Sequence, residues 1–186
     1  MEVSAEQVLF MRRSGQEDMM KALVTYFSQT GNTEKVARAI YDAIETAEKD
    51  IVPISDVRDV APYDVIFCGF PVQAHNVPSV VESFIEGLPE GTRLALFGTH
   101  GSLRGGELAV QAFYQAITIS PKLSILGTFG CRGKVKRSLL EALMKKSEHM
   151  AWAIEAQGAA GHPDRADLED AAEFARTMIT KSRALG

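Results

Sequence analysis

The stretch SQTGNT, Ser28–Thr33, joins a short apolar run at residues 22–27 to an amphipathic segment that begins near Thr33. The run predicts a strand, and the recurrence of Val36 and Ile40 on one face of the segment predicts a helix. The first amides of a helix have no partner within it, and they carry partial positive charge. The junction therefore predicts an anion site suited to phosphate.

The side chains of this loop also suit phosphate. Hydroxyl groups occur at Ser28, Thr30 and Thr33, and Gly31 lets the backbone approach closely. The patterns G-x-x-x-x-G-K-[ST] and G-x-G-x-x-G are both missing, and the lack of the first argues against a nucleoside triphosphate site. The alternative is a plain strand-to-helix turn that is capped by Asn32 or Thr30.

The loop resembles the FMN-phosphate loop of flavodoxins, which reads [ST]-x-T-G-x-T directly after the first strand, and Ser28–Thr33 matches every fixed position. This resemblance covers about residues 20–181 and implies FMN as the cofactor. The segments at 130–134 and 161–164 resemble a less typical subgroup of flavodoxin-like FMN proteins from bacteria and archaea, with a helical insertion near the C-terminus.

Composition indicates one globular domain, because 46% of the 186 residues are hydrophobic and 24% are charged. We expect this domain at residues 20–186, after an N-terminal extension at 1–19 that is disordered or a misassigned start. The net charge of −4 and the lack of a long basic cluster argue against a nucleic-acid partner. No apolar run approaches the roughly 20 residues of a membrane helix. Two cysteines fit a reducing compartment, so we expect a cytoplasmic protein. We expect it to be a monomer or a homodimer.

Strands and helices alternate along the chain, which predicts right-handed crossovers and a parallel sheet covered on both faces. The implied fold is a flavodoxin-like three-layer α/β/α sandwich with strand order 2-1-3-4-5 and FMN where the order reverses. The expected strands are 22–27, 50–54, 65–69, 94–98 and 123–129, and the expected helices begin at 33, 79, 107 and 168.

A helical insertion is expected at 138–161, where Ser138 and Glu141 predict a capping box. Asp167 is the expected cap of the final helix.

Two long loops, 69–78 and 98–106, follow the third and fourth strands, at the edge where parallel sheets bind ligands. We expect flat or apolar side chains to sandwich the isoalloxazine ring and polar ones to contact its edge. The tyrosine or tryptophan that flavodoxins typically stack on the ring does not occur in these loops. The expected cofactor-binding residues are Ser28, Gln29, Thr30, Gly31, Asn32, Thr33, Phe70, Pro71, Val72, Gln73, Ala74, His75, Gly98, Thr99, His100 and Gly101.

Alternatives remain for several of these residues. Ordinary packing is the alternative for the apolar residues 70–72, and a solvated surface position is the alternative for His75 and His100. No metal site is predicted, because His149 and His162 have no partner at the usual zinc spacing.

The segment after the fifth strand has two interpretations. Arg132 and Lys134, beside Gly133, either face the flavin, where they recognise an acidic partner or a second nucleotide, or lie in a solvated turn.

The resemblance implies an FMN protein that carries electrons between a reductase and an acceptor protein, with no catalytic side chain of its own. The alternative is an FMN-dependent reductase or oxidase in which residues 138–161 and 101–106 wall in a small substrate. A third interpretation is a domain without flavin that binds another phosphorylated metabolite, or a partner protein, through the same loop.

Overall fold

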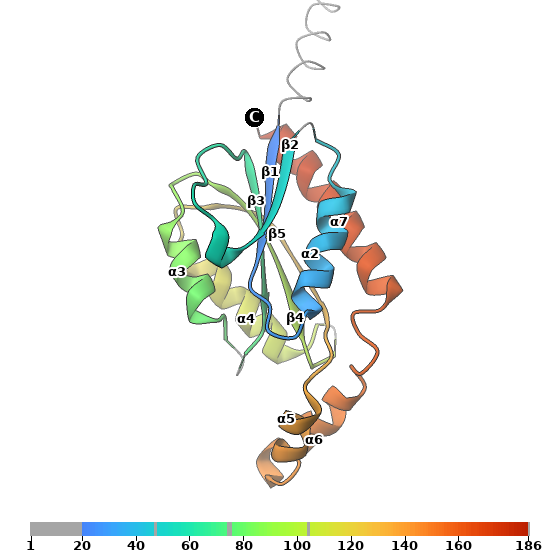
Figure 1. Cartoon of the computed structure of the whole chain (residues 1–186). Helices are drawn as coiled ribbons and strands as arrows, with labels where there is room; N and C mark the ends of the chain where they lie inside the picture. The colour runs from blue at the N-terminus through green and yellow to red at the C-terminus, as the bar shows by residue number, and fades with distance from the viewer. Residues whose placement is uncertain (1–19, 47, 74–75, 104, 186) are drawn as a thin grey trace, which may run out of the picture.

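The structure is a computed structural model that describes residues 20–46, 48–73, 76–103 and 105–185, so the extension predicted at 1–19 lies outside the described residues. Five parallel strands form one sheet in the order β2-β1-β3-β4-β5, which confirms the predicted topology (Figure 1). The strands are β1 Lys21–Tyr26, β2 Glu48–Pro53, β3 Val65–Pro71, β4 Arg93–His100 and β5 Ser124–Arg132.

The inner strands are buried along nearly their whole length. In β1, β3 and β4 every residue but one is buried, as expected of parallel strands that are covered on both faces. Strand β2 has no buried residue and ends at Pro53, which lacks the amide that a ladder needs. Pro53 therefore lies on an edge strand, as the sequence predicted.

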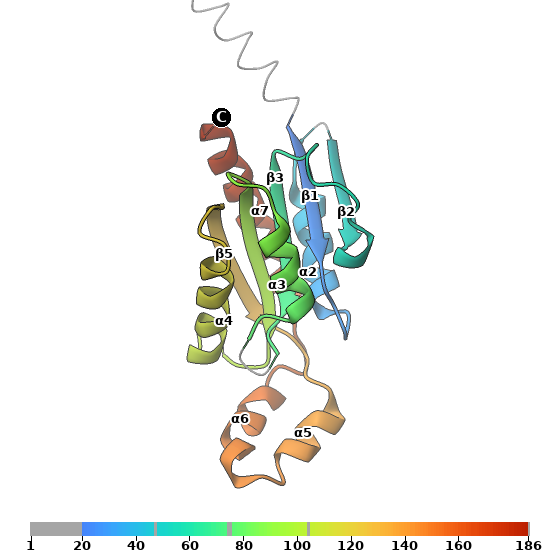
Figure 2. The same ribbon diagram turned by 90° about the vertical axis from the view of Figure 1, so that its left-hand side faces the viewer.

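Four helices cover the two faces of the sheet (Figures 1 and 2). Helices α2 (Asn32–Ala43) and α7 (Arg165–Ala184) pack side by side on one face. Helices α3 (Ser79–Gly87) and α4 (Glu107–Thr118) lie on the other, and the short helix η1 (Ile54–Asp56) follows β2. These layers confirm the predicted three-layer sandwich.

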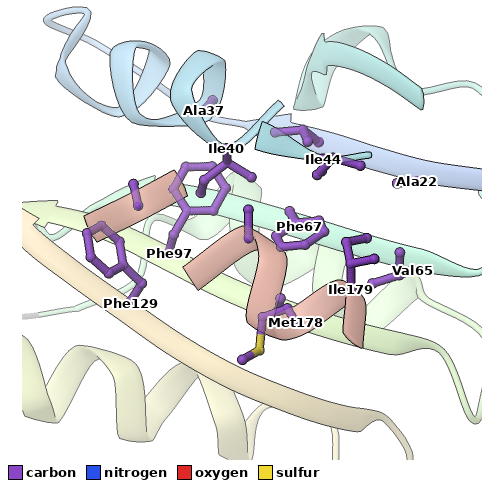
Figure 3. Close-up of a cluster of buried hydrophobic side chains, with 14 of the residues drawn as sticks. Ala22, Ala37, Ile40, Ile44, Val65, Phe67, Phe97, Phe129, Met178 and Ile179 are labelled. Carbon is purple, nitrogen blue, oxygen red and sulfur yellow. The ribbon is translucent and has the colours of Figure 1, made fainter. Parts of the chain in front are cut away.

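The core beneath α2 and α7 is built from every second residue of the strands. Phe67 and Phe97 point from the sheet toward Ile40 of α2 and Met178 of α7 (Figure 3). The ring of Phe67 meets that of Phe174 edge-on, with centroids 6.3 Å apart. Burying each such side chain stabilises the fold by about 1.5–3 kcal/mol, so α7 is held by the same core as α2.

Three strands run further than the sequence predicted, to Pro71, His100 and Arg132. The prediction ends each of them at or just before a glycine, a residue type that weakens strands. Gly69 instead continues β3 and leaves room for a neighbouring ring, since a Cβ atom there would overlap Phe97. The consequence is that several predicted loop residues are strand residues, with side chains fixed to one face of the sheet.

Between β5 and α7 the chain forms a helical hairpin of α5 (Arg137–Leu143) and α6 (Ser147–Gln157), which confirms the predicted insertion. The hairpin projects beyond the edge of the sheet where the strands end (Figures 1 and 2). The predicted capping box at Ser138 is wrong, because α5 begins one residue earlier and has no side-chain cap. Glu141 instead pairs with Arg137 at 2.8 Å.

The predicted cap of the final helix is also displaced. Asp164 caps α7 by accepting a hydrogen bond from the amide of Asp167 at 3.0 Å. Asp167 lies three residues further on and accepts one from the amide of Asp164, also at 3.0 Å. The two carboxylates form a reciprocal capping box, so the prediction of Asp167 as the cap is wrong by three residues.

Candidate functional site

The loop between β1 and α2 has the geometry of an anion site. Gly31 is the N-cap of α2 and adopts a φ of 82°, a left-handed conformation that glycine accepts without steric cost. Its amide donates to Ser28 Oγ at 3.2 Å, which closes the loop on itself. Within the described chain, the amides of Asn32, Thr33 and Glu34 donate to no protein acceptor. Three unpaired donors at a helix N-terminus fit a phosphate group.

Side-chain capping of α2 by Asn32 or Thr30, the alternative raised from the sequence, is excluded. No side chain caps α2, and Asn32 is already its first helical residue. Asn32 Nδ2 donates to Thr30 Oγ1 at 3.0 Å and to the carbonyl of Lys134 at 2.9 Å. The nearly buried amide side chain therefore ties the loop to the segment that follows β5.

The first turn of α2 carries one acidic residue, Glu34, which would repel a phosphate. Its carboxylate pairs with Arg38 at 2.7 Å, one turn further along the helix. This ion pair raises the pKa of the Arg38 guanidinium and draws the negative charge away from the helix end.

The loop is joined to β4 by two hydroxyl groups. Thr33 Oγ1 lies 2.9 Å from Thr99 Oγ1, and both residues are almost fully buried. Gln29 and Thr30 are the exposed residues of the loop.

The predicted residues after β3 divide into two groups. Phe70 is fully buried and packs against Phe113 with ring centroids 5.6 Å apart, so its ring belongs to the core and is removed from the candidates for flavin stacking. Pro71, Val72 and Gln73 are half-buried, and the amide of Val72 donates to the carbonyl of Thr99 at 2.9 Å. Gln73 and Asn76 form a small bridge, while Ala74 and His75 between them lie outside the described residues.

The predicted residues at the end of β4 are packed more tightly than a solvated loop. Gly98, Thr99, His100 and Gly101 are all buried. Burial lowers the pKa of His100, and the hydrogen bond between its Nδ1 and the carbonyl of Ser102, 3.0 Å long, partly offsets that effect. His100 is therefore not the solvated surface histidine that the sequence left open.

The hairpin supplies an anchor that the sequence did not reveal. A Cβ atom on Gly101 would lie 2.7 Å from Val135 and 3.1 Å from Trp152 of α6. The indole Nε1 of Trp152 donates to Ser102 Oγ at 3.0 Å, and Glu155 Oε1 accepts from the amide of Leu103 at 2.7 Å. The loop after β4 is thus held from outside by α6.

Arg132 is part of the same anchor. Its guanidinium donates to the carbonyl of Glu155 at 2.7 Å, a contact that neither interpretation from the sequence included. Lys134 is exposed. The contacts of Glu155 with Leu103 and Arg132 each use a backbone atom of a segment far away in the sequence, so no residue pattern signals them.

Two other features of the described chain contain none of the predicted cofactor-binding residues. An open surface hollow of about 650 Å³ is lined by residues of α2 and α7, which include Lys35, Asp42 and Arg176 but none of the predicted cofactor-binding residues. His162 lies 2.5 Å from Asp167 and 3.7 Å from Asp164, a grouping missed from the sequence. The capping box of α7 accounts for both carboxylates.

Comparisons with known proteins agree with this geometry. The family model described as "Flavodoxin domain" matches residues 23–176. The flavodoxin-like domain-containing protein BilS of Clostridioides difficile (strain CD3) is 32% identical over 175 residues, covering 88% of this chain and 98% of BilS. The flavodoxin of Megasphaera elsdenii is 37% identical over 87 residues, covering 42% of this chain and 64% of that protein.

Solved structures share the fold. A flavodoxin from the domain Archaea superposes with a TM-score of 0.58 at 17% identity, covering 88% of this chain and 99% of that one. The solution structure of two-electron reduced Megasphaera elsdenii flavodoxin gives 0.50 at 26% identity, covering 75% and 98%.

Together, the fold, the loop and these relatives define an FMN-binding electron-transfer flavoprotein. The chain belongs to the flavodoxin family, and FMN is its cofactor, as the sequence predicted. Among the helices of the described ranges, none has the length and apolar character to cross a bilayer.

Proposed function

We propose that the loop Ser28–Thr33 holds the FMN phosphate and that the segments after β3 and β4 hold the isoalloxazine ring. The unpaired amides of Asn32, Thr33 and Glu34 carry this proposal, because a dianion at a helix N-terminus would accept from all three. The exposed hydroxyl of Thr30 adds a further donor.

Around the ring, the described residues offer half-buried Pro71, Val72 and Gln73 on one side and the end of β4 on the other. FMN supplies the one- or two-electron chemistry. The protein orients the ring, excludes water from part of it and sets its electrostatic surroundings. Ala74 and His75 stay predictions of the same site.

We further propose that the chain carries electrons between a reductase and an acceptor protein in the cytoplasm, as a monomer or homodimer. Both cysteines, Cys68 and Cys131, are buried and form no disulfide, which supports a reducing compartment. The electron-transfer family to which the chain belongs supports the carrier over the enzyme alternative, in which the insertion walls in a substrate.

The phosphate assignment is tested with FMN and riboflavin, which share the ring but differ in the phosphate. Thr30→Ala removes a hydrogen bond to a charged group, about 1.5–3 kcal/mol, so the Kd for FMN should rise roughly tenfold or more. The Kd for riboflavin should not change. Fluorescence quenching measures both. An equal loss for both flavins, or no loss for FMN, would remove the loop from the phosphate site.

The electron-carrier role has its own test. The FMN-loaded protein is mixed with NADH or NADPH in a stopped-flow instrument, and flavin absorbance is followed. Slow reduction that accelerates on adding a reductase protein supports the carrier. Rapid reduction by the nicotinamide alone would favour the enzyme alternative.

A further inference from the structure

The segment at 132–149 is basic in an otherwise acidic chain. It contains six arginine and lysine residues and two glutamates, a net charge of +4, whereas the whole chain carries −4 and the remaining residues therefore carry −8. Of the described cations in this segment, Arg137 alone pairs with a carboxylate. The exposed, unpaired lysines are Lys134, Lys136, Lys145 and Lys146.

The same hairpin exposes apolar side chains. Helix α5 contains three leucines, yet none of its residues is buried. Leu139 of α5 is 47% exposed and Ile154 of α6 is 57% exposed. Leu103, in the loop that α6 anchors, is 56% exposed. Apolar side chains surrounded by charge are the usual anatomy of a protein–protein interface.

The hairpin is also fixed to the proposed flavin site. Trp152 and Glu155 of α6 hold the loop after β4, and the carbonyl of Lys134 accepts the hydrogen bond of Asn32 from the phosphate loop. A protein seated on this surface would be next to both segments that we propose to hold FMN.

We propose that this surface docks an acidic protein that exchanges electrons with the flavin. The basic hairpin is defined here as α5, α6 and the four lysines around them, with Leu139 and Ile154 as its apolar part. The inference rests on the proposed electron-carrier function, and charge complementarity selects the partner: an uncompensated positive surface attracts and orients an acidic one.

A second copy of the chain fits this surface poorly. A closed twofold dimer that brought the hairpin against itself would set like charges against each other. A dimer that seated the hairpin on acidic residues of the other copy would need both reciprocal contacts to form at once. We therefore take a different, acidic protein as the occupant.

Binding is tested first without electron transfer. The probe is a plastocyanin of the acidic type in its copper(I) form, which cannot accept an electron, added to the ¹⁵N-labelled, oxidised full chain. Amide shifts should change at the hairpin, including Leu139 and Ile154. These shift changes should be absent in the K145E/K146E variant. They should persist in the control R58E/K122E, which makes the same charge change at exposed residues away from the hairpin.

Electron transfer is tested next, with copper(II) plastocyanin and the reduced FMN-loaded protein. Each copper(II) takes one electron and becomes copper(I), so two plastocyanins reoxidise one FMN, and the flavin releases its protons to solvent. At low salt K145E/K146E should slow this reaction roughly tenfold, since electrostatic steering contributes about 10 to 10³ to association rates. With cytochrome c, a basic oxidant, the same variant should react faster.

The Kd for FMN separates the two proposals. If FMN binds normally but the hairpin shifts are absent, or respond equally to R58E/K122E, the docking surface is overturned and the FMN site stands. If FMN does not bind but the shifts are present, the carrier function fails and the basic surface remains.

Concentration-dependent self-association that K145E/K146E abolishes would assign the surface to a second copy. Binding to phosphatidylserine vesicles that the same variant abolishes, without plastocyanin shifts, would assign it to lipid.

Discussion

The hydroxyl of Thr33, at the start of α2, lies 2.9 Å from the hydroxyl of Thr99, near the end of β4. Both side chains are almost fully buried, and 65 residues separate them in the chain. This hydrogen bond links the phosphate loop to the strand that leads into the other proposed flavin-binding segment. A buried hydrogen bond thus joins the two segments that we propose to hold FMN.

The energy of this link is measurable by a double-mutant cycle. Thr33→Val or Thr99→Val keeps the shape of the side chain but leaves the partner hydroxyl buried and unpaired, at a cost of about 1–3 kcal/mol. The double variant removes both groups and should cost less than the sum of the singles. Urea denaturation of the four proteins gives the coupling. Strictly additive losses would mean that the two hydroxyls do not depend on each other.

The backbone of the phosphate loop depends on Gly31. Its φ of 82° strains any residue with a Cβ atom, although a Cβ there would meet no atom within 4 Å. Gly31→Ala should therefore lower the free energy of unfolding by about 1–2 kcal/mol through conformation alone. Gly87→Ala is the matched control, because that Cβ also meets nothing and Gly87 ends a helix with ordinary dihedrals. Equal effects of the two substitutions would contradict the strain argument.

The approach of Gly133 to Asn32 gives a prediction about affinity. A Cβ atom on Gly133 would lie 3.0 Å from Asn32 Nδ2 and 3.1 Å from Thr99 Cβ, so Gly133→Ala must push the asparagine aside. Losing the hydrogen bond from Asn32 to the carbonyl of Lys134, about 1 kcal/mol, should raise the Kd for FMN roughly fivefold. Gly161→Ala, where the added Cβ meets nothing, should leave it unchanged. Calorimetric titration with FMN compares the two variants.

His100 gives the fold a dependence on pH. Burial lowers its pKa below the ordinary value of 6.5, so the unfolded chain binds more protons than the folded one between these two values. The contribution of His100 to stability is therefore fully present above about pH 6.5 and is lost as the pH falls toward the lower, folded pKa. His100→Gln should flatten the dependence of unfolding free energy on pH in this range. An unchanged slope would show that His100 does not titrate with folding.

The sheet could be predicted because its cause is local and repetitive. Apolar runs such as 65–69 and 94–98 report burial on both faces, and their alternation with helices leaves few possible topologies. The strand-to-helix loop at 28–33 could be predicted for a similar reason, since Gly31 acts through its own backbone. Its binding of phosphate stays a prediction.

The rest of the site depends on contacts between distant segments. The prediction placed Phe70 in a loop because it ended β3 at Gly69, but that glycine lies within the strand to make room for Phe97. Once the strand continues, its alternation directs Phe70 into the core. The clamp between Asn32 and Lys134 uses a backbone carbonyl, which any residue type supplies. The identity of residue 134 therefore does not predict this hydrogen bond.

The packing of α2 on α7 has a consequence for the order in which the chain is synthesised. Helix α2 is among the first elements to leave the ribosome, and α7 follows every other described element. Ile40 of α2 and Met178 of α7 lie in one core, so a nascent chain without α7 lacks these packing partners of α2. The complete core beneath α2 therefore exists only after translation has passed residue 178.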